Sequence, residues 1–178
     1  TSVSKFGGSS LFLDGTGDYL NDSDAAYAFG TGDFTVECWA YSTESPSTAD
    51  NGIFQIANSL TDPNLTGIAV ALAGGGAGVP VIYSGGSQTN GTTAVSINTW
   101  HHYALVRSGS SLKLYFDGQE EISVTNSSNL TDNNLLLAAY YSTGFPWQGY
   151  IDEFRITKGV ARYTEAFTPP DLAFPVHS

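Results

Sequence analysis

The chain alternates between short runs of β-forming residues and clusters of Gly, Asn, Asp, Ser and Pro, with a turn signal roughly every ten residues and no long helical period. This spacing is typical of antiparallel sandwiches and barrels. The length of 178 residues is in the range of one domain. The sequence therefore predicts one all-β domain over residues 1–178. We expect strands at residues 10–13, 34–41, 52–57, 67–73, 80–83, 100–107, 111–116, 121–124, 135–141 and 149–156.

Residues 34–41 show the clearest strand pattern. Alternation places Phe34 and Val36 on one face and Glu37 and Trp39 on the other, so both faces carry bulky side chains. This pattern predicts a central strand that is covered on both sides. Cys38 is the only cysteine and has no internal disulfide partner, so we expect it to be a small core residue.

Turn chemistry marks two further features. The pair Asp117-Gly118 separates two alternating runs and predicts a tight hairpin, because both residues tolerate positive φ angles. The pair Pro169-Pro170 marks the end of regular structure, so residues 171–178 are expected to be a C-terminal tail or linker.

Acidic residues outnumber basic ones by 17 to 6, and the net charge is −11. Nucleic-acid binding requires Lys and Arg to displace counterions from phosphates, so the charge disfavours nucleic acid as a partner. It disfavours an anionic membrane surface for the same reason. No segment has the roughly 20 apolar residues of a membrane span. The acidic excess fits divalent cations, neutral polar ligands such as glycans, or simply solubility.

Several charged and titratable residues are expected inside strands. His101 and His102 are adjacent in a strand and point to opposite faces, so they cannot chelate one metal together, and we expect structural roles for both. We also expect ion pairs that stabilise buried positions among Glu37, Arg107, Glu153 and Arg155.

Five phrases of the sequence resemble, in their order and spacing, the LamG-like or concanavalin A-like lectin/glucanase superfamily. The phrases lie at residues 15–20, 33–39, 100–107, 112–118 and 149–156. The resemblance extends from about Phe6 to Pro170. It implies two curved antiparallel sheets in a jelly-roll β-sandwich, a fold that hosts lectins, adhesion modules, hydrolases and spacers alike.

Residues 157–164 resemble the variant of this domain found in bacteriophage virion proteins and large bacterial surface proteins. There the domain is one module among several. The chain contains no methionine, so we expect it to be processed or to be part of a larger protein. The resemblance implies a location on a virion surface, or an extracellular or cell-surface location.

Enzymes of this superfamily that cut glycans place two or three carboxylates on one face of a strand, and retaining chemistry needs two of them about 5 Å apart. Asp152 and Glu153 point to opposite faces of a strand, and Glu120-Glu121 follows a hairpin turn. Asp22 and Asp24 have the required spacing but lie in a polar loop. The sequence therefore disfavours an enzyme and indicates no catalytic residues.

A structural calcium site is one candidate. Asp14 and Asp18 lie in a loop with two glycines between them, and such loops gather the oxygen ligands that calcium prefers. The resemblance implies that calcium would tie this turn to the Asp of the terminal strand, which is Asp152. The alternative is that Asp14 and Asp18 cap turns and that Asp152 accepts hydrogen bonds from a neighbouring loop.

Glycan binding requires aromatic faces for stacking and amide or carboxylate groups for sugar hydroxyls. The turn-rich segment 140–148 combines Tyr140, Tyr141, Phe145 and Trp147. An aromatic loop is costly to leave in water unless it packs or binds. A second candidate set is Tyr83, Gln88 and Asn90, in a Gly/Ser-rich segment after a strand. The alternative for both sets is packing between the sheets or contact with another subunit.

Together these features predict a non-catalytic carbohydrate-binding or adhesion module whose partner is a glycan or host surface polysaccharide. One alternative is a structural virion domain, such as a capsid decoration or fibre, that contacts other subunits. A glycan-cleaving enzyme is the least favoured alternative, for the carboxylate reason above.

Overall fold

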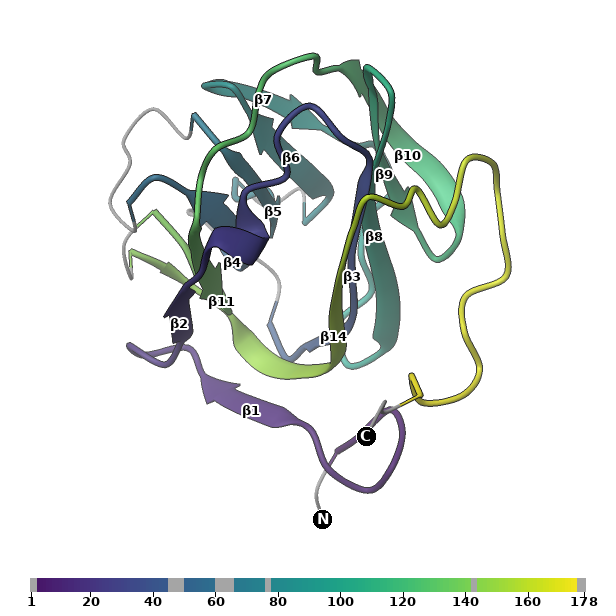
Figure 1. Cartoon of the computed structure of the whole chain (residues 1–178). Helices are drawn as coiled ribbons and strands as arrows, with labels where there is room; N and C mark the ends of the chain where they lie inside the picture. Colours follow the sequence, from purple (N-terminus) through teal and green to yellow (C-terminus); the bar gives the residue numbers. More distant parts are fainter. Residues whose placement is uncertain (1–2, 45–49, 60–65, 76–77, 142–143, 176–178) are drawn as a thin grey trace.

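Two antiparallel sheets pack face to face in a computed structural model that describes residues 3–44, 50–59, 66–75, 78–141 and 144–175 (Figure 1). Each sheet has six strands in this part of the chain. We call them sheet A and sheet B. The all-β sandwich expected from the sequence is confirmed.

Sheet A has the strand order β1-β14-β3-β8-β9-β10. Its strands are β1 (Leu11–Asp14), β3 (Phe34–Ser42), β8 (Trp100–Ser108), β9 (Ser111–Phe116), β10 (Gln119–Thr125) and β14 (Gln148–Lys158). Sheet B has the order β2-β11-β4-β5-β6-β7. Its strands are β2 (Leu20–Ser23), β4 (Asn51–Ala57), β5 (Ile68–Leu72), β6 (Pro80–Ser84), β7 (Ser87–Asn90) and β11 (Asn134–Leu137).

Short elements complete the fold. A two-stranded hairpin pairs β12 (Ala139–Tyr140) with β13 (Phe145–Pro146), and the 3-10 helix η1 spans Ala25–Tyr27. Asp24 caps η1, because its carboxylate accepts a hydrogen bond of 2.7 Å from the Ala26 N–H. No helix within the described ranges is long and apolar enough to cross a membrane.

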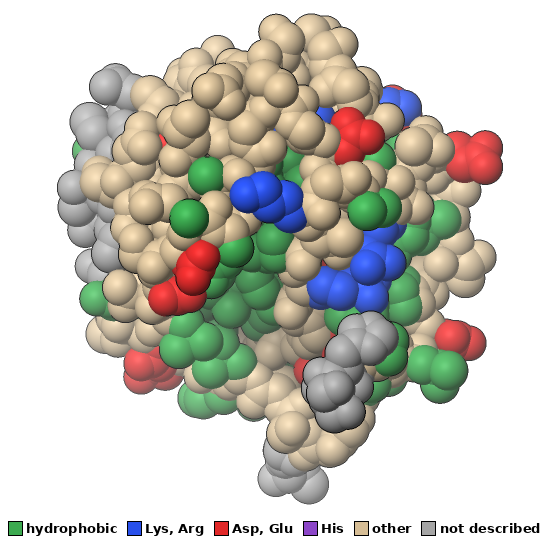
Figure 2. All heavy atoms as spheres, viewed as in Figure 1, with side chains coloured by type: hydrophobic (Ala, Val, Ile, Leu, Met, Phe, Trp, Pro, Cys, Tyr) green, Lys and Arg blue, Asp and Glu red, His purple; other side chains and the backbone are tan. Residues whose placement is uncertain are grey.

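The inner faces of both sheets form one hydrophobic core. Val36 and Leu105 of sheet A, and Ile56 and Val70 of sheet B, belong to it and are at most 1% exposed. Figure 2 views the same side as Figure 1 and shows hydrophobic side chains at the surface there, bordered by Lys, Arg, Asp and Glu side chains. Because side chains from sheet A and from sheet B belong to this one core, the core joins the two sheets into one body.

The strand β3 is buried on both faces, as its alternation predicts. Its inner face meets the core. The part of its outer face that carries Thr35 and Glu37 is covered by residues 159–175, which we call the C-terminal strap and which run along the outside of sheet A in Figure 1. Tyr163 and Phe167 of the strap stack at 3.6 Å between ring centroids and pack against Val106 and Tyr115.

The strap also brings the two ends of the described chain together. Phe174 donates its N–H to Glu153, and the adjacent Asp152 accepts from the N-terminal Lys5 N–H at 2.9 Å. The expected tail at residues 171–178 is thus partly docked. Residues 176–178 lie outside the described ranges.

Candidate functional site

The outer face of sheet B carries a stack of aromatic rings. Tyr83 of β6 stacks on Tyr140 of β12, with 5.0 Å between ring centroids and 24° between planes. Tyr140 stacks in turn on Phe145 of β13, at 4.8 Å and 23°. The sequence placed Tyr83 in one candidate set and Tyr140 and Phe145 in another, and the structure brings these three residues into one cluster.

A kink in the chain at Ala138 places Tyr140 on the outer face of sheet B. The predicted strand 135–141 is interrupted at Ala138, whose φ is +71°, so β11 ends and β12 starts as a separate element. The Ala138 N–H donates to the Ile53 carbonyl at 2.7 Å, which ties the kink to β4. Gly52 lets the chain approach, because a Cβ there would lie 2.4 Å from the backbone of Ala139 and Tyr140.

Two polar residues that the sequence did not single out hold the cluster. Asp50 accepts hydrogen bonds from the hydroxyls of Tyr83 and Tyr140, the latter at 3.0 Å, and from the Gly74 N–H at 2.7 Å. The Gln55 side chain is fully buried and accepts the Tyr141 N–H at 2.7 Å. A single Gln in an otherwise apolar strand indicates a buried hydrogen bond, because buried polar groups are hydrogen-bonded. The sequence around Asp50 has no comparable feature that predicts its role.

The electrostatics of the cluster keep both tyrosines neutral. Burial raises the pKa of Tyr83, and its hydrogen bond to Asp50 raises it further. Burial also raises the pKa of Tyr140, with additional contributions from Tyr83 and Asp50. The hydroxyls are therefore protonated at neutral pH. Both carboxylate oxygens of Asp50 accept hydrogen bonds within the cluster. Asp50 therefore holds the tyrosine rings in position and is not available as a base for a ligand.

The edge strand β7 adds amide groups beside the rings. Gln88 is the cross-strand partner of Tyr83, and cross-strand partners point to the same face. Its amide donates to the Asn90 side chain at 2.8 Å, and both residues are exposed. We refer to Tyr83, Gln88, Asn90, Tyr141 and Phe145, with Tyr140 and Asp50 beneath them, as the sheet B site. Within it Tyr141 is 38% exposed and Tyr140 only 5%.

Trp147 does not line this site. Its side chain is 0% exposed and belongs to the core between the sheets. This burial corrects its assignment to an exposed loop, and it follows from the return of the chain into sheet A immediately after β13. Residues 142–143 of the expected loop lie outside the described ranges.

The three candidate calcium ligands do not form one site. Asp14 accepts the Thr16 N–H at 2.7 Å, and Asp18 accepts the Asp14 N–H at 3.0 Å, so the two carboxylates close their own turn. Asp152 accepts the N–H groups of Lys5, Phe6 and Glu153 at 2.9 to 3.1 Å. Asp14 pairs with Gln148, four residues from Asp152 along β14. Among the described residues, no group of three or more His, Cys, Asp or Glu side chains is placed to hold a metal.

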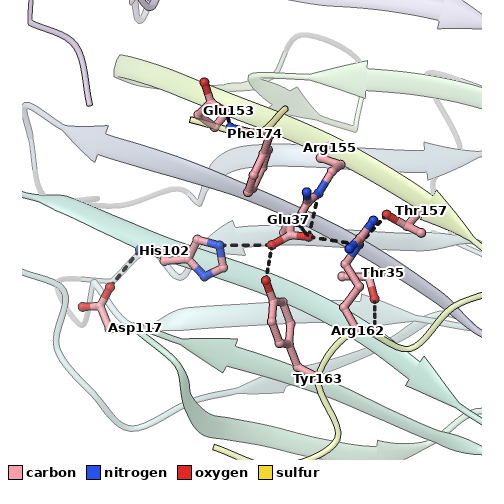
Figure 3. Close-up of polar contacts among 10 residues, drawn as sticks. All are labelled: Thr35, Glu37, His102, Asp117, Glu153, Arg155, Thr157, Arg162, Tyr163 and Phe174. Carbon is pink, nitrogen blue, oxygen red and sulfur yellow. Dashed lines mark hydrogen bonds and ion pairs between the residues drawn. The ribbon is translucent and has the colours of Figure 1, made fainter. Parts of the chain in front are cut away.

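Of the residues expected to form ion pairs, Glu37 and Arg155 pair with each other beneath the strap (Figure 3). Glu37 Oε1 accepts from Arg155 Nε at 3.0 Å and Nη2 at 2.7 Å, and Oε2 accepts from the Tyr163 hydroxyl at 2.9 Å. His102 Nε2 lies 3.3 Å from Oε2, at ion-pair distance but without hydrogen-bond geometry. Burial alone would raise the pKa of Glu37, but the contacts with His102, Arg155 and Tyr163 outweigh it and lower the pKa.

Two other residues expected in these ion pairs have backbone partners instead. Arg107 donates to the carbonyls of Gly30, Gly32 and Ser128, and Glu153 accepts the Phe174 N–H. His101, for which the sequence predicts a structural role, contacts Asp117 through Nδ1 at 2.7 Å.

The adjacent carboxylates also have separate partners. Glu120 pairs with Lys113, and Glu121 accepts the Thr93 N–H at 2.7 Å. Asp152 and Glu153 hold the N-terminal segment and the strap, respectively. Neither pair presents two carboxylates to one ligand.

Comparison with known proteins places the fold. The family model described as the concanavalin A-like lectin/glucanases superfamily (Laminin_G_3) matches residues 14–165. No curated protein gives a significant sequence match.

Several solved structures share the fold. Domain 4 of AbnA, an extracellular arabinanase from Geobacillus stearothermophilus in complex with arabinotriose, is 21% identical, with a TM-score of 0.65 over 85% of this chain and 71% of that chain. A putative carbohydrate-binding protein from Bacteroides ovatus is 16% identical, with a TM-score of 0.64 over 82% of this chain and 42% of that one. The CBM40 of Ruminococcus gnavus IT-sialidase, bound to α2,3-sialyllactose, is 13% identical, with a TM-score of 0.62 over 87% and 91%.

Proposed function

Since the chain belongs to the concanavalin A-like lectin/glucanase superfamily, we propose that it is a non-catalytic carbohydrate-binding module that holds a glycan at the sheet B site. We further propose that the domain is secreted or displayed on a surface. The similar structures described above include an arabinanase domain with arabinotriose and a sialidase module with sialyllactose, which supports this proposal.

One observation carries the proposal: stacked rings and exposed amide side chains meet on one face of sheet B. The faces of sugar rings carry C–H groups that pack on aromatic side chains, as Tyr141 and Phe145 offer. Sugar hydroxyls need donors and acceptors, which the exposed amides of Gln88 and Asn90 supply. Binding sites that combine apolar contact with a few well-placed polar groups are typical for small polar ligands. The hydrogen bonds of Asp50 hold the rings in place before the ligand arrives, which reduces the entropy lost on binding.

The carboxylates support a role without catalysis. A retaining glycosidase needs two carboxylates about 5 Å apart that face one substrate. Asp50 is the acidic residue of the sheet B site, and its oxygens are occupied by two tyrosine hydroxyls and a backbone N–H. A general acid or base would need a proton that can leave or arrive. The site thus offers binding groups without a paired acid and base.

The test is a glycan array followed by calorimetry on the sugar that binds. We expect the Gln88→Ala, Asn90→Ala double variant to bind about tenfold more weakly, because hydrogen bonds to the sugar are lost. Both residues are exposed, so the melting temperature should stay unchanged. Leu172→Ala, at a side chain that is 74% exposed on the strap, is the matched control. Wild-type affinity in the double variant, or no binding to any glycan, would refute the proposal.

The alternative is a structural domain of a virion or surface assembly. The segment that suggests a virion, residues 157–164, belongs to β14 and the strap, where Arg162 donates its N–H to Thr35 at 3.0 Å. The segment 157–164 therefore makes structural contacts within the domain itself. Exposed hydrophobic side chains such as Leu20, at 53% exposure on the edge strand β2, favour contact with another subunit. Sedimentation that shows a stable oligomer, combined with no glycan binding, would select this alternative.

A further inference from the structure

A second aromatic surface crosses the outer face of sheet A, on the opposite side of the sandwich from the sheet B site. It consists of Phe12, Tyr150, Tyr41 and Trp100, one residue from each of the adjacent strands β1, β14, β3 and β8. The register pairs Phe12 with Tyr150, Tyr150 with Tyr41, and Tyr41 with Trp100. We call these four residues the aromatic row.

The rings touch one another along the row. The centroids are 5.0 Å apart between Phe12 and Tyr150, 5.7 Å between Tyr150 and Tyr41, and 5.5 Å between Tyr41 and Trp100. These separations follow the spacing of neighbouring strands, about 4.8 Å. Because direct cross-strand partners stabilise each other, the sheet holds the four rings in a line that runs perpendicular to its strands.

The row faces solvent rather than the core. Its neighbours along the strands, Leu13, Ala40 and Ile151, point into the core and are at most 2% exposed. Phe12 is 57% exposed, and the other three rings are half-buried. The strap covers the other end of this face, where it packs on Val106 and Tyr115.

The shape of the row selects its ligand. A row that is one ring wide covers much less area than the roughly 800 Å² that each partner usually buries in a protein–protein interface. The step from ring to ring is close to the length of one sugar residue in an extended chain. The planes of neighbouring rings are inclined at 44°, 81° and 60°, so the row cannot lie flat against a crystalline polysaccharide. It fits a single chain that twists along its length.

We propose that the aromatic row is a second glycan-binding site, which takes one extended chain of neutral sugar residues laid across β1, β14, β3 and β8. This inference rests on the proposed function of carbohydrate binding and gives it a second site with a different ligand length. Sites on opposite faces of one sandwich let a single domain hold two chains at once. Linked sites of this kind increase retention on a polysaccharide without new contacts.

The length of the ligand provides the test. Calorimetry with cellohexaose, xylohexaose and mannohexaose, beside the corresponding disaccharides, measures the affinity for each length. We expect at least one hexasaccharide to bind and its disaccharide to bind much more weakly, because a disaccharide covers only part of the row. A domain that binds none of the three hexasaccharides overturns the inference.

Two double variants locate the binding. Phe12→Leu with Tyr150→Leu removes two rings but keeps apolar side chains, so the fold should survive, which a thermal melt checks. We expect hexasaccharide affinity to fall about tenfold. The cross-control is Tyr141→Leu with Gln88→Ala, which alters the sheet B site and should leave hexasaccharide binding at the row intact.

The outcomes separate the two proposals. Unchanged hexasaccharide binding in the row variant overturns the second site, while loss of array binding in the sheet B variant would still support the proposed function. The reverse pattern places glycan binding on sheet A alone. A change of oligomeric state in the row variant, measured by sedimentation, would assign the row to contact between copies of the chain and overturn the inference.

Discussion

The buried carboxylate of Glu37 receives partners from three separate parts of the chain. Arg155 comes from β14, His102 from β8 and Tyr163 from the strap. The side chain of Glu37 is 0% exposed, and an isolated charge at such a position would be strongly destabilising. Its partners compensate for the lost hydration. The same residue that sits mid-strand in sheet A therefore also fixes the position of the strap (Figure 3).

We expect Glu37→Gln to lower the free energy of unfolding at pH 7 by about 3 kcal/mol, because it removes the buried charge that pairs with the partly buried Arg155. The pKa of Glu37 is below its usual value of 4.5. Its stabilisation is therefore fully present above about pH 4.5 and is lost as the pH falls through the folded-state pKa. Urea unfolding across this range measures the difference, which should shrink on acidification. Glu120→Gln, at a solvent-exposed pair, is the control and should stay near wild type. A difference that grows towards low pH would contradict this account.

Asp152 gives a second test at this scale. Its carboxylate accepts three backbone N–H groups, two of them from the N-terminal segment. We expect Asp152→Ala to lower stability by about 2 kcal/mol, because these donors lose their acceptor. The loss should be equal in calcium and in chelator, and the wild-type melting temperature should not respond to either. A wild-type melting temperature that rises with calcium would instead support an ion held by Asp14, Asp18 and Asp152, since a ligand that binds only the native state stabilises it.

At the scale of elements, the C-terminal strap acts as an additional layer on sheet A. It has no regular secondary structure over residues 159–175, yet Tyr163 and Phe167 cover a small cluster with Ala104, Val106 and Tyr115. The Phe167 N–H donates to the Gly118 carbonyl at 2.9 Å, so the β9–β10 hairpin holds the strap directly. The pair Asp117-Gly118, which the sequence predicts to be a turn, thus also contacts the strap.

Gly118 and Gly109 allow a matched test of this contact. Both lie in hairpin turns of sheet A, with φ of +79° and +60°. A Cβ at Gly118 would lie 1.9 Å from the Phe167 carbonyl oxygen, whereas a Cβ at Gly109 meets nothing within 4 Å. We expect Gly109→Ala to cost about 1 kcal/mol from its left-handed backbone. Gly118→Ala should cost clearly more and should speed tryptic cleavage after Arg162, because the strap is displaced. Equal stability and equal cleavage in both variants would show that the strap does not depend on this contact.

At the scale of the whole molecule, one core joins both sheets. Leu105 and Leu114 of sheet A belong to the same cluster as Ile56 and Leu137 of sheet B. The chain crosses between the sheets several times, since β1 and β3 lie in sheet A while β2 and β4 lie in sheet B. Neither sheet can bury its inner face without the other. We therefore propose that the chain folds as a single domain, as its length suggests.

We expect unfolding in one cooperative transition. Far-UV circular dichroism follows both sheets, while tryptophan fluorescence reports Trp39 and Trp100 of sheet A and the core residue Trp147. The two signals should give the same midpoint and the same denaturant dependence, as two-state unfolding requires. Midpoints that differ between the probes would mean that the sheets unfold separately.

Much of the strand pattern could be predicted from the sequence. Residues 34–41 and 111–116 alternate clearly, and β3 and β9 lie at these positions. Two edge strands could not be predicted in this way. β2 has the sequence Leu-Asn-Asp-Ser and is exposed throughout, and β7 consists of four polar residues. Their backbone pairing depends on the neighbouring strand rather than on an apolar face of their own, so periodicity carries no sign of them.

Alternation in the sequence predicts most of the long strands and the side chains that share a face within each, because alternation is a property of the local backbone. Which aromatic residues meet depends on how distant strands pair. Tyr83 and Tyr140 stack although 57 positions separate them, Trp147 is buried, and Phe12 lines up with Trp100 across four strands. Strand order and register set these neighbours, and both result from burying the whole core at once. The candidate sites therefore follow from pairing between distant strands, which no single segment encodes.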